Sequence, residues 1–222
     1  MASTHYLCET GSVIETSPAR RTQAERREGT IGALLDATVT CLTERGYAAT
    51  STAAVCAAAG VSQGALFRHF PTRQALLVAT AEHVATRNVE AFRATVGSDV
   101  ETVDDVVAVL SHLRTAVLSP ANQTWRELLV AARADADLRA ALLPARESLQ
   151  AQLLDTAADL WVDRLRGDDL GAVLSIVVNM LDGLAFSALD PDPTAAPGRT
   201  VERALRLLAE MVVHLYPQQE NR

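Results

Sequence analysis

Residues 57–70, AAAGVSQGALFRHF, constrain the fold more than any other stretch of the chain. An alanine-rich segment runs into Gly60, a residue type that can adopt the left-handed conformation that ends a helix. Ser62 follows as a candidate N-cap for a second helix. Pro71 ends that helix, because proline disfavours helical geometry in the residue before it. The stretch therefore predicts two short helices joined by a tight turn.

The second of these helices has two contrasting faces. At about 100° per residue, Leu66 and Phe70 point toward the same side, which we expect to be the core. The opposite face begins with Gln63 and Gly64 and continues to Arg68. A slim, polar N-terminal face suits the major groove of DNA. With a longer helix in front, the pair predicts a helix-turn-helix over about residues 50–70.

The whole chain is expected to be all-α. Alanine and leucine dominate, aromatic residues make up only 4%, and runs of β-branched residues with a period of two are missing. Thr50, Ser51 and Thr52 offer N-cap hydroxyls for the first short helix, and Thr72 for the helix after Pro71. The expected helices are 21–45, about 52–59, 62–70, 72–95, 101–118, 121–133, 135–166, 168–189 and 199–216.

Several details of these helices follow from the pattern. Gly46 is expected to end the first helix, and Pro144 to break or kink the helix over 135–166. The helix over 168–189 is apolar nearly all round, which predicts burial on more than one side. A membrane span is the alternative, but Asn179 and Asp182 argue against it. The last helix has its expected core stripe at Val201, Leu205, Leu208, Val212 and Leu215.

Charge is distributed unevenly along the 222 residues. Residues 19–95 carry a balance of +3 and residues 96–222 a balance of −8, within a total of −7. The asymmetry predicts a basic N-terminal module on an acidic body. We expect a flexible arm over 1–20, a DNA-binding domain over 21–80 and a helical ligand-binding and dimerisation domain over 81–222.

Other classes of protein find little support. The three cysteines, Cys8, Cys41 and Cys56, have no metal-ligand spacing, and no secretory signal is visible, so we expect a cytoplasmic protein. The five histidines are scattered, and the catalytic motifs of hydrolases, metalloproteases and nucleotide-binding enzymes are missing. We expect no enzyme, no cofactor and no metal. A purely structural helical protein would leave the polar face from Gln63 to Arg68 unexplained.

The stretch Gly46–Ala79, GYAATSTAAVCAAAGVSQGALFRHFPTRQALLVA, resembles the DNA-binding domain of the TetR family of transcriptional regulators. The resemblance extends from Gly32 to near Glu82. It implies a homodimeric regulator that binds a palindromic operator in double-stranded DNA, usually a repressor released by a small molecule. An activator, or a regulator without a ligand, remains the alternative.

The resemblance also implies residue roles at the DNA. Thr50 and Ser51 would cap the second helix near a phosphate, and Arg73 would offer a guanidinium fork to phosphate oxygens. Phe67 stands where the family usually has tyrosine, which leaves apolar contact with a thymine methyl. His69 occupies the position of a backbone-contacting histidine. The full set of expected DNA contacts is Thr50, Ser51, Ser62, Gln63, Gly64, Ala65, Phe67, Arg68, His69 and Arg73.

Each of these has a plain structural alternative. Phe70 is expected in the core, His69 could be a partly buried structural histidine, and Arg68 could be merely solvated. The family further implies dimerisation through the last two long helices and a pocket in each C-terminal body. Polar and aromatic residues within apolar helices are the candidate pocket residues, although tryptophans are often core and arginines often solvated: His112, Trp125, Arg126, Arg133, Trp161, Asn179 and Asp182. Walls of Leu, Val and Ala would favour a lipophilic or aromatic ligand.

Overall fold

The computed structural model describes residues 22–95, 100–160, 167–187 and 197–216. The expected arm over 1–20 and the candidate Trp161 lie outside these ranges. Across the described ranges all regular structure is helical, which confirms the predicted all-α class. The helices are α1 (Gln23–Ala49), α2 (Thr52–Ala59), α3 (Gln63–His69), α4 (Arg73–Thr95), α5 (Val103–Val117), α6 (Pro120–Ala132), α7 (Ala136–Leu160), α8 (Gly167–Ser187) and α9 (Arg199–Leu215).

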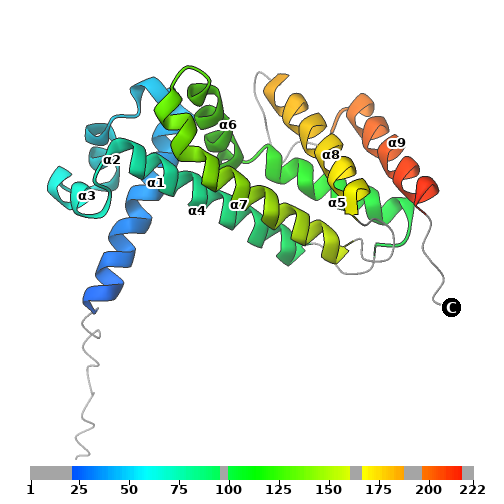
Figure 1. The fold of residues 1–222 in the computed structure, drawn as a ribbon, viewed down its shortest axis with the longest axis horizontal. Coiled ribbons are helices and arrows are strands. Elements are labelled where there is room, and N and C mark those ends of the chain that lie inside the picture. Colours follow the sequence, from blue (N-terminus) through cyan, green and yellow to red (C-terminus); the bar gives the residue numbers. More distant parts are fainter. Residues whose placement is uncertain (1–21, 96–99, 161–166, 188–196, 217–222) are drawn as a thin grey trace, which may run out of the picture.

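The helices form an elongated body with two different ends (Figure 1). At one end α2 and α3 pack beside α1 and the start of α4, an assembly that we call the N-terminal head. At the other end α5 packs against both α8 and α9. Between them α4 and α7 run alongside each other, with α6 packed on α1 and α4. The turn between α2 and α3 is thereby presented at one extremity of the molecule.

The N-terminal head has its own apolar core. Leu34 of α1, Val55 of α2, Leu66 of α3 and Leu76 of α4 are buried together in it. Each of these four helices contributes apolar residues that it could not bury alone. The core therefore fixes the angle at which α3 leaves the turn.

Two further clusters of similar size fill most of the rest of the body. In the middle, Leu42 of α1 and Leu77 of α4 pack with Trp125 and Leu128 of α6 and residues of α7. At the far end Phe92 of α4 joins the core of α5, α8 and α9. Helix α4 thus contributes to all three cores, with the adjacent Leu76 and Leu77 facing different ones.

The predicted helix boundaries agree closely with the structure near the turn. Gly60 ends α2 at φ 67° and ψ 28°, in the left-handed conformation expected of it. Gly46, at φ 72°, interrupts α1 as predicted, but one further turn follows before Ala49. Thr22 begins α1 with a capping box in which its hydroxyl and the Glu25 carboxylate each accept a backbone N–H.

Two details of the C-terminal helices differ from the sequence pattern. Of the predicted break or kink at Pro144, the break does not occur, because α7 continues through this residue. The proline removes one helical hydrogen bond, but Leu142 and Ala145 beside it are anchored in the middle core, which holds the helix through that point. Leu215 is 65% exposed rather than part of the core stripe of α9. It lies about 80° round the helix from Leu205, at the edge of the buried face.

Helix α8 carries an apolar surface that the other described helices leave largely uncovered. Among the described helices it is the one long and apolar enough to cross a membrane, over Gly167–Phe186, yet only 22% of that apolar window is buried. Within the described ranges, the burial on more than one side that the sequence predicts is therefore not reached.

Leu66 is expected to be far more important for stability than its neighbour Phe67. Leu66 is fully buried in the head, whereas Phe67 is 45% exposed. We expect Leu66→Ala to lower the free energy of unfolding of the head by about 2–5 kcal/mol. Phe67→Ala should change it by about 0.5 kcal/mol or less. Urea unfolding followed by circular dichroism compares the two, and equal losses would contradict the assigned core.

Candidate DNA interface and internal cavity

The turn between α2 and α3 is held by local hydrogen bonds. The Ser62 Oγ accepts the backbone N–H of Ala65 at 3.2 Å, which confirms Ser62 as the N-cap of α3. On the other side of the turn, the N–H of Val61 donates to the Cys56 carbonyl at 3.1 Å. Both helix ends are thus closed without help from other elements. The turn is thus closed locally, and packing of Leu66 and Phe70 in the head core then sets the direction of α3.

The faces of α3 divide as the sequence predicts. Leu66 and Phe70 are buried in the head, while Gln63, Gly64 and Arg68 are exposed. Ala65 and His69 are half-buried at the borders of this face. The exposed face begins at a helix N-terminus, where free N–H groups and the helix dipole favour an anion such as phosphate.

Gly64 has no role in the fold that would require glycine. A Cβ added there would meet nothing closer than the Ser62 Oγ at 4.0 Å, and the backbone is helical with no positive φ. Glycine inside a helix is destabilising by about 1 kcal/mol relative to alanine. A bare backbone on the outer face of α3 is of use mainly to something that approaches it closely from outside.

The cap of α2 is Ser51 alone, which corrects the expected role of Thr50. The Ser51 Oγ accepts the N–H of Ala54 at 3.1 Å, and Ser51 is exposed. Thr50 is only 1% exposed, and its hydroxyl donates to the Gly46 carbonyl at 2.8 Å. That hydroxyl therefore closes the end of α1 and does not face outward.

Arg73 also differs from its expected role. Its Nε donates to the Thr50 carbonyl at 2.8 Å and its Nη2 to the Tyr47 carbonyl at 2.6 Å. The guanidinium lies 4.3 Å from the centre of the Tyr47 ring. The fork therefore ties the start of α4 to the end of α1 instead of facing outward. Tyr47 continues the link, because its hydroxyl donates to Asp135 at 3.2 Å, just before α7.

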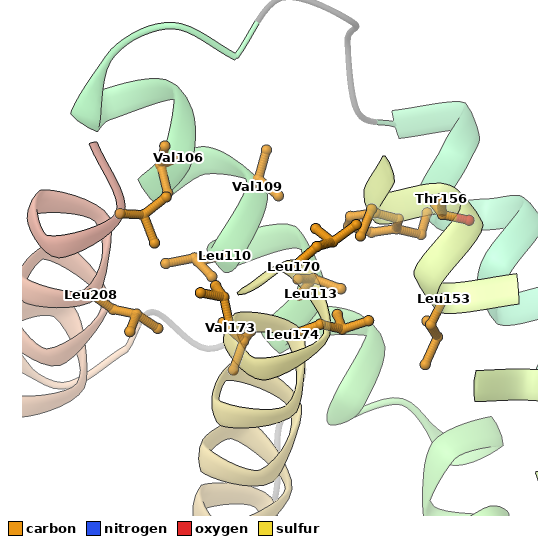
Figure 2. A pocket seen from close by; sticks show the side chains of 14 residues that line it. Val106, Val109, Leu110, Leu113, Leu153, Thr156, Leu170, Val173, Leu174 and Leu208 are labelled. Atoms are coloured by element: carbon orange, nitrogen blue, oxygen red, sulfur yellow. The ribbon is translucent and has the colours of Figure 1, made fainter. Parts of the chain in front are cut away.

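A cavity lies inside the far end of the body, between α4, α5, α7, α8 and α9. Figure 2 shows its wall, with Val109, Leu110 and Leu113 of α5 facing Leu170, Val173 and Leu174 of α8. Thr156 of α7 is the one polar side chain among the described residues that line it. The cavity volume is about 50 Å³. Such a wall can bind only an apolar group.

A second cavity, of about 110 Å³, adjoins the first, and Phe92, Leu113 and Leu153 line both. Two of the predicted pocket residues, Trp125 and Asp182, line this second cavity. Arg126 stands behind Asp182, with 14% of its side chain exposed and its Nη1 3.7 Å from Asp182 Oδ1. Burial raises the pKa of the Asp182 carboxyl, an effect that Arg126 and Asn122 oppose.

The other predicted pocket residues lie elsewhere. His112 is exposed on α5, and its Nδ1 lies 2.8 Å from the Ala108 carbonyl of its own helix. Asn179 is exposed on α8 and donates to the Ser175 carbonyl. Arg133 lies in a surface groove beside Arg139 and Arg146. Polar and aromatic residues do not mark a cavity whose wall is apolar. Helix periodicity alone does not show which leucines face a cavity.

Nothing in the described ranges resembles a metal site, since no group of three or more His, Cys, Asp or Glu side chains converges there. The candidate binding sites are instead the exposed face of α3, which suits a polyanion, and an internal apolar cavity.

Comparison with known proteins decides the family. Residues 34–80 match the family described as bacterial regulatory proteins of the tetR family. An uncharacterized HTH-type transcriptional regulator of Mycobacterium tuberculosis is 35% identical over 167 residues, covering 75% of this chain and 86% of the relative. The chain belongs to the TetR family.

Further likenesses extend over the C-terminal body of this TetR-family protein. The HTH-type transcriptional regulator CymR of Pseudomonas putida is 37% identical over 175 residues, covering 78% of this chain and 86% of CymR. A transcriptional regulator from Rhodococcus sp. Rha1 has the same fold, with a TM-score of 0.67 at 18% identity over 86% of this chain and 99% of the other. The protein is therefore a DNA-binding transcriptional regulator, and its family is not one of enzymes.

Arg73 is expected to stabilise the head rather than bind DNA directly. Arg73→Ala leaves the Thr50 carbonyl without its donor and the Tyr47 carbonyl with only the Thr50 N–H at 3.3 Å, so it should lower the free energy of unfolding by about 1–3 kcal/mol. The slope of log affinity for duplex DNA against log salt concentration should stay unchanged. Urea unfolding and fluorescence anisotropy measure the two, with the exposed Arg45→Ala as the control. A normal stability with a slope smaller by about one would place Arg73 on a phosphate.

Proposed function

We propose that the protein is a homodimeric repressor that reads a palindromic operator with two copies of α3 and leaves it when an apolar small molecule enters the cavity. TetR-family regulators bind DNA and usually act as dimers with small-molecule effectors. In this proposal residues 21–80 bind DNA and residues 81–222 form the ligand-binding and dimerisation part. The protein acts in the cytoplasm, where its operator is.

The proposed DNA contacts divide by chemistry. Gln63, Arg68 and the bare backbone at Gly64 and Ala65 meet base edges, because they lie on the outer face of the helix that enters the major groove. Phe67 offers apolar contact to a thymine methyl. Ser51 and Ser62, at the N-termini of α2 and α3, lie near phosphates together with His69. Thr50 and Arg73 have no part in this set, since both serve the end of α1.

Arg68 is expected to carry sequence information. It is exposed on α3 and in no ion pair with a described residue, so its fork is available for the O6 and N7 of a guanine. Arg68→Ala should weaken binding to the operator by about 1–3 kcal/mol and binding to unrelated DNA much less. Fluorescence anisotropy with both duplexes measures this, with the exposed Arg146→Ala on α7 as control. An equal loss on both duplexes would leave Arg68 a phosphate role only.

The exposed apolar residues of the last two helices support a dimer. Ile176 and Phe186 of α8 and Leu207, Met211 and Leu215 of α9 are all exposed large hydrophobic side chains. They share the far end of the body with the core that α5, α8 and α9 form. A second copy covering these residues would bury them on a self-complementary, two-fold interface. Two heads at a fixed separation would then read two half-sites.

Charges placed on this surface are expected to dissociate the dimer. Ile176→Glu and Met211→Glu each force a carboxylate into the proposed apolar interface, which is costly without a partner. We expect monomers in size-exclusion chromatography with light scattering, and at least about tenfold weaker operator binding because one head makes too few contacts. Leu143→Glu, at an exposed leucine of α7, is the matched control. A dimer that survives both changes would place the interface elsewhere.

The observation that carries the release mechanism is the course of α4. This helix starts at Arg73, which clamps the head, and its later turns supply Phe92 to the cavity wall. Both cavities, at about 50 and 110 Å³, are smaller than typical ligand sites of about 300–1,000 Å³. An occupant must therefore push its walls apart. Movement of α4 at Phe92 would be transmitted along a continuous helix to the head and change the separation of the two copies of α3.

A further inference from the structure

The two adjoining cavities differ sharply in what they offer a ligand. In the first, Thr156 has its hydroxyl engaged on both sides: it donates to the Gln152 carbonyl at 2.7 Å and accepts from Arg93 Nε at 2.9 Å. The other described lining residues are apolar. The first cavity therefore has no free hydrogen-bond donor among its described lining residues. An effector meets it mainly with hydrocarbon.

The second cavity is lined by polar as well as apolar residues. Asn88 of α4, Asn122 and Trp125 of α6, and Asp182 of α8 line it together with apolar neighbours. The polar groups thus lie in the second cavity, and Phe92, Leu113 and Leu153 form an apolar wall that it shares with the first. This arrangement suits a ligand with an apolar body and a single polar end.

Asp182 is the group best placed to receive that polar end. Its Oδ1 accepts from Asn122 Nδ2 at 3.3 Å and lies 3.7 Å from Arg126 Nη1. Within the described part of the chain, Oδ2 takes part in no hydrogen bond or ion pair. A carboxylate oxygen that lines a cavity with no partner can accept a hydrogen bond from an occupant.

Arg126 decides which kind of donor fits. Its guanidinium is held behind Asp182, with Nη1 donating to the Val117 carbonyl at 2.6 Å, and it does not line either cavity. The carboxylate therefore already has its countercharge, so a ligand cation would lie close to a like charge. A ligand carboxylate would meet Asp182 first and be repelled. A neutral hydroxyl suffers neither penalty.

We propose that the effector is an uncharged, largely apolar molecule bearing one hydroxyl group, which donates a hydrogen bond to Asp182 while the apolar body fills the cavity lined by α5 and α8. This inference rests on the proposed function, because it assigns the ligand class of the same cavity. Asn122 and Arg126 act as positioning residues that hold the Asp182 carboxylate. The Asp182 side chain is 40% exposed, so its free oxygen exchanges a water contact for the hydroxyl of the ligand. A site that offers a charged acceptor to a hydroxyl disfavours the analogue that lacks it.

Four probes of similar shape test the donor directly: 4-butylphenol, butylbenzene, 4-butylbenzoate and 4-butylbenzylamine. Isothermal titration calorimetry with the full-length wild-type protein should give affinity for 4-butylphenol at least about tenfold above butylbenzene, as for a hydrogen bond to a charged group. The phenol should also exceed both charged probes. Its binding should release the protein from operator DNA.

A double variant supplies the matched control. Arg126→Met combined with Asp182→Leu replaces the ion pair by apolar side chains, a change that is often neutral or stabilising. It should keep its helicity and dimer size, bind butylbenzene at least as well as the wild type, and lose the preference for the phenol. Asp182→Asn, which keeps the shape and one acceptor oxygen, should reduce the preference only in part.

Each contrary result has a distinct meaning. Equal wild-type affinity for the phenol and butylbenzene, or a phenol preference that survives in the double variant, would overturn the hydroxyl assignment while leaving an apolar effector intact. Strongest binding of the benzoate would mean that Arg126 and not Asp182 faces the ligand, and strongest binding of the amine would mean that Asp182 selects a cation. Binding of none of the four to the wild type would overturn the apolar cavity as the effector site, and this inference with it.

Discussion

The structure depends on one helix, α4, that joins the head, middle and far cores. Leu76 of α4 packs into the head, Leu77 into the middle core and Phe92 into the far core, so the ends of the molecule share a continuous rigid element. The Arg73 bonds to the Tyr47 and Thr50 carbonyls fasten that element to α1 at the head. Packed cores respond to strain by shifting between discrete arrangements and not by deforming smoothly. In the proposed release mechanism, a displacement of Phe92 would therefore move α4 as a unit and change the position of α3.

The same architecture explains why the molecule has two unpaired surfaces of opposite character. The outer face of α3 is polar and has a helix N-terminus, whereas the exposed residues of α8 and α9 are large and apolar. The first is suited to a polyanion and the second to a copy of itself. They lie at opposite ends of α4, so a dimer that joins the apolar ends leaves both heads free to reach DNA (Figure 1).

Much of the head could be predicted from the sequence because its signals are local. Gly60, Ser62 and Leu66 each act within one turn, and the structure has them as expected. Thr50 and Arg73 could not be assigned in this way, since adjacent hydroxyls compete for one cap and a long side chain finds its partners in space. Helix α8 is apolar nearly all round, so its sequence does not show which residues face the core. That Asp182 lines the cavity while Asn179 is exposed emerges only from packing against α5, α6 and α7.

In the proposed dimer, two linked heads read a symmetric site. Selection of binding sites from a random DNA library by the purified protein, at a fixed salt concentration of about 150 mM because phosphate contacts make affinity strongly salt-dependent, tests it most directly. We expect enrichment of one palindromic motif, with its two half-sites at a constant spacing. Enrichment of an isolated half-site, or no enrichment with only weak, salt-sensitive binding, would contradict it.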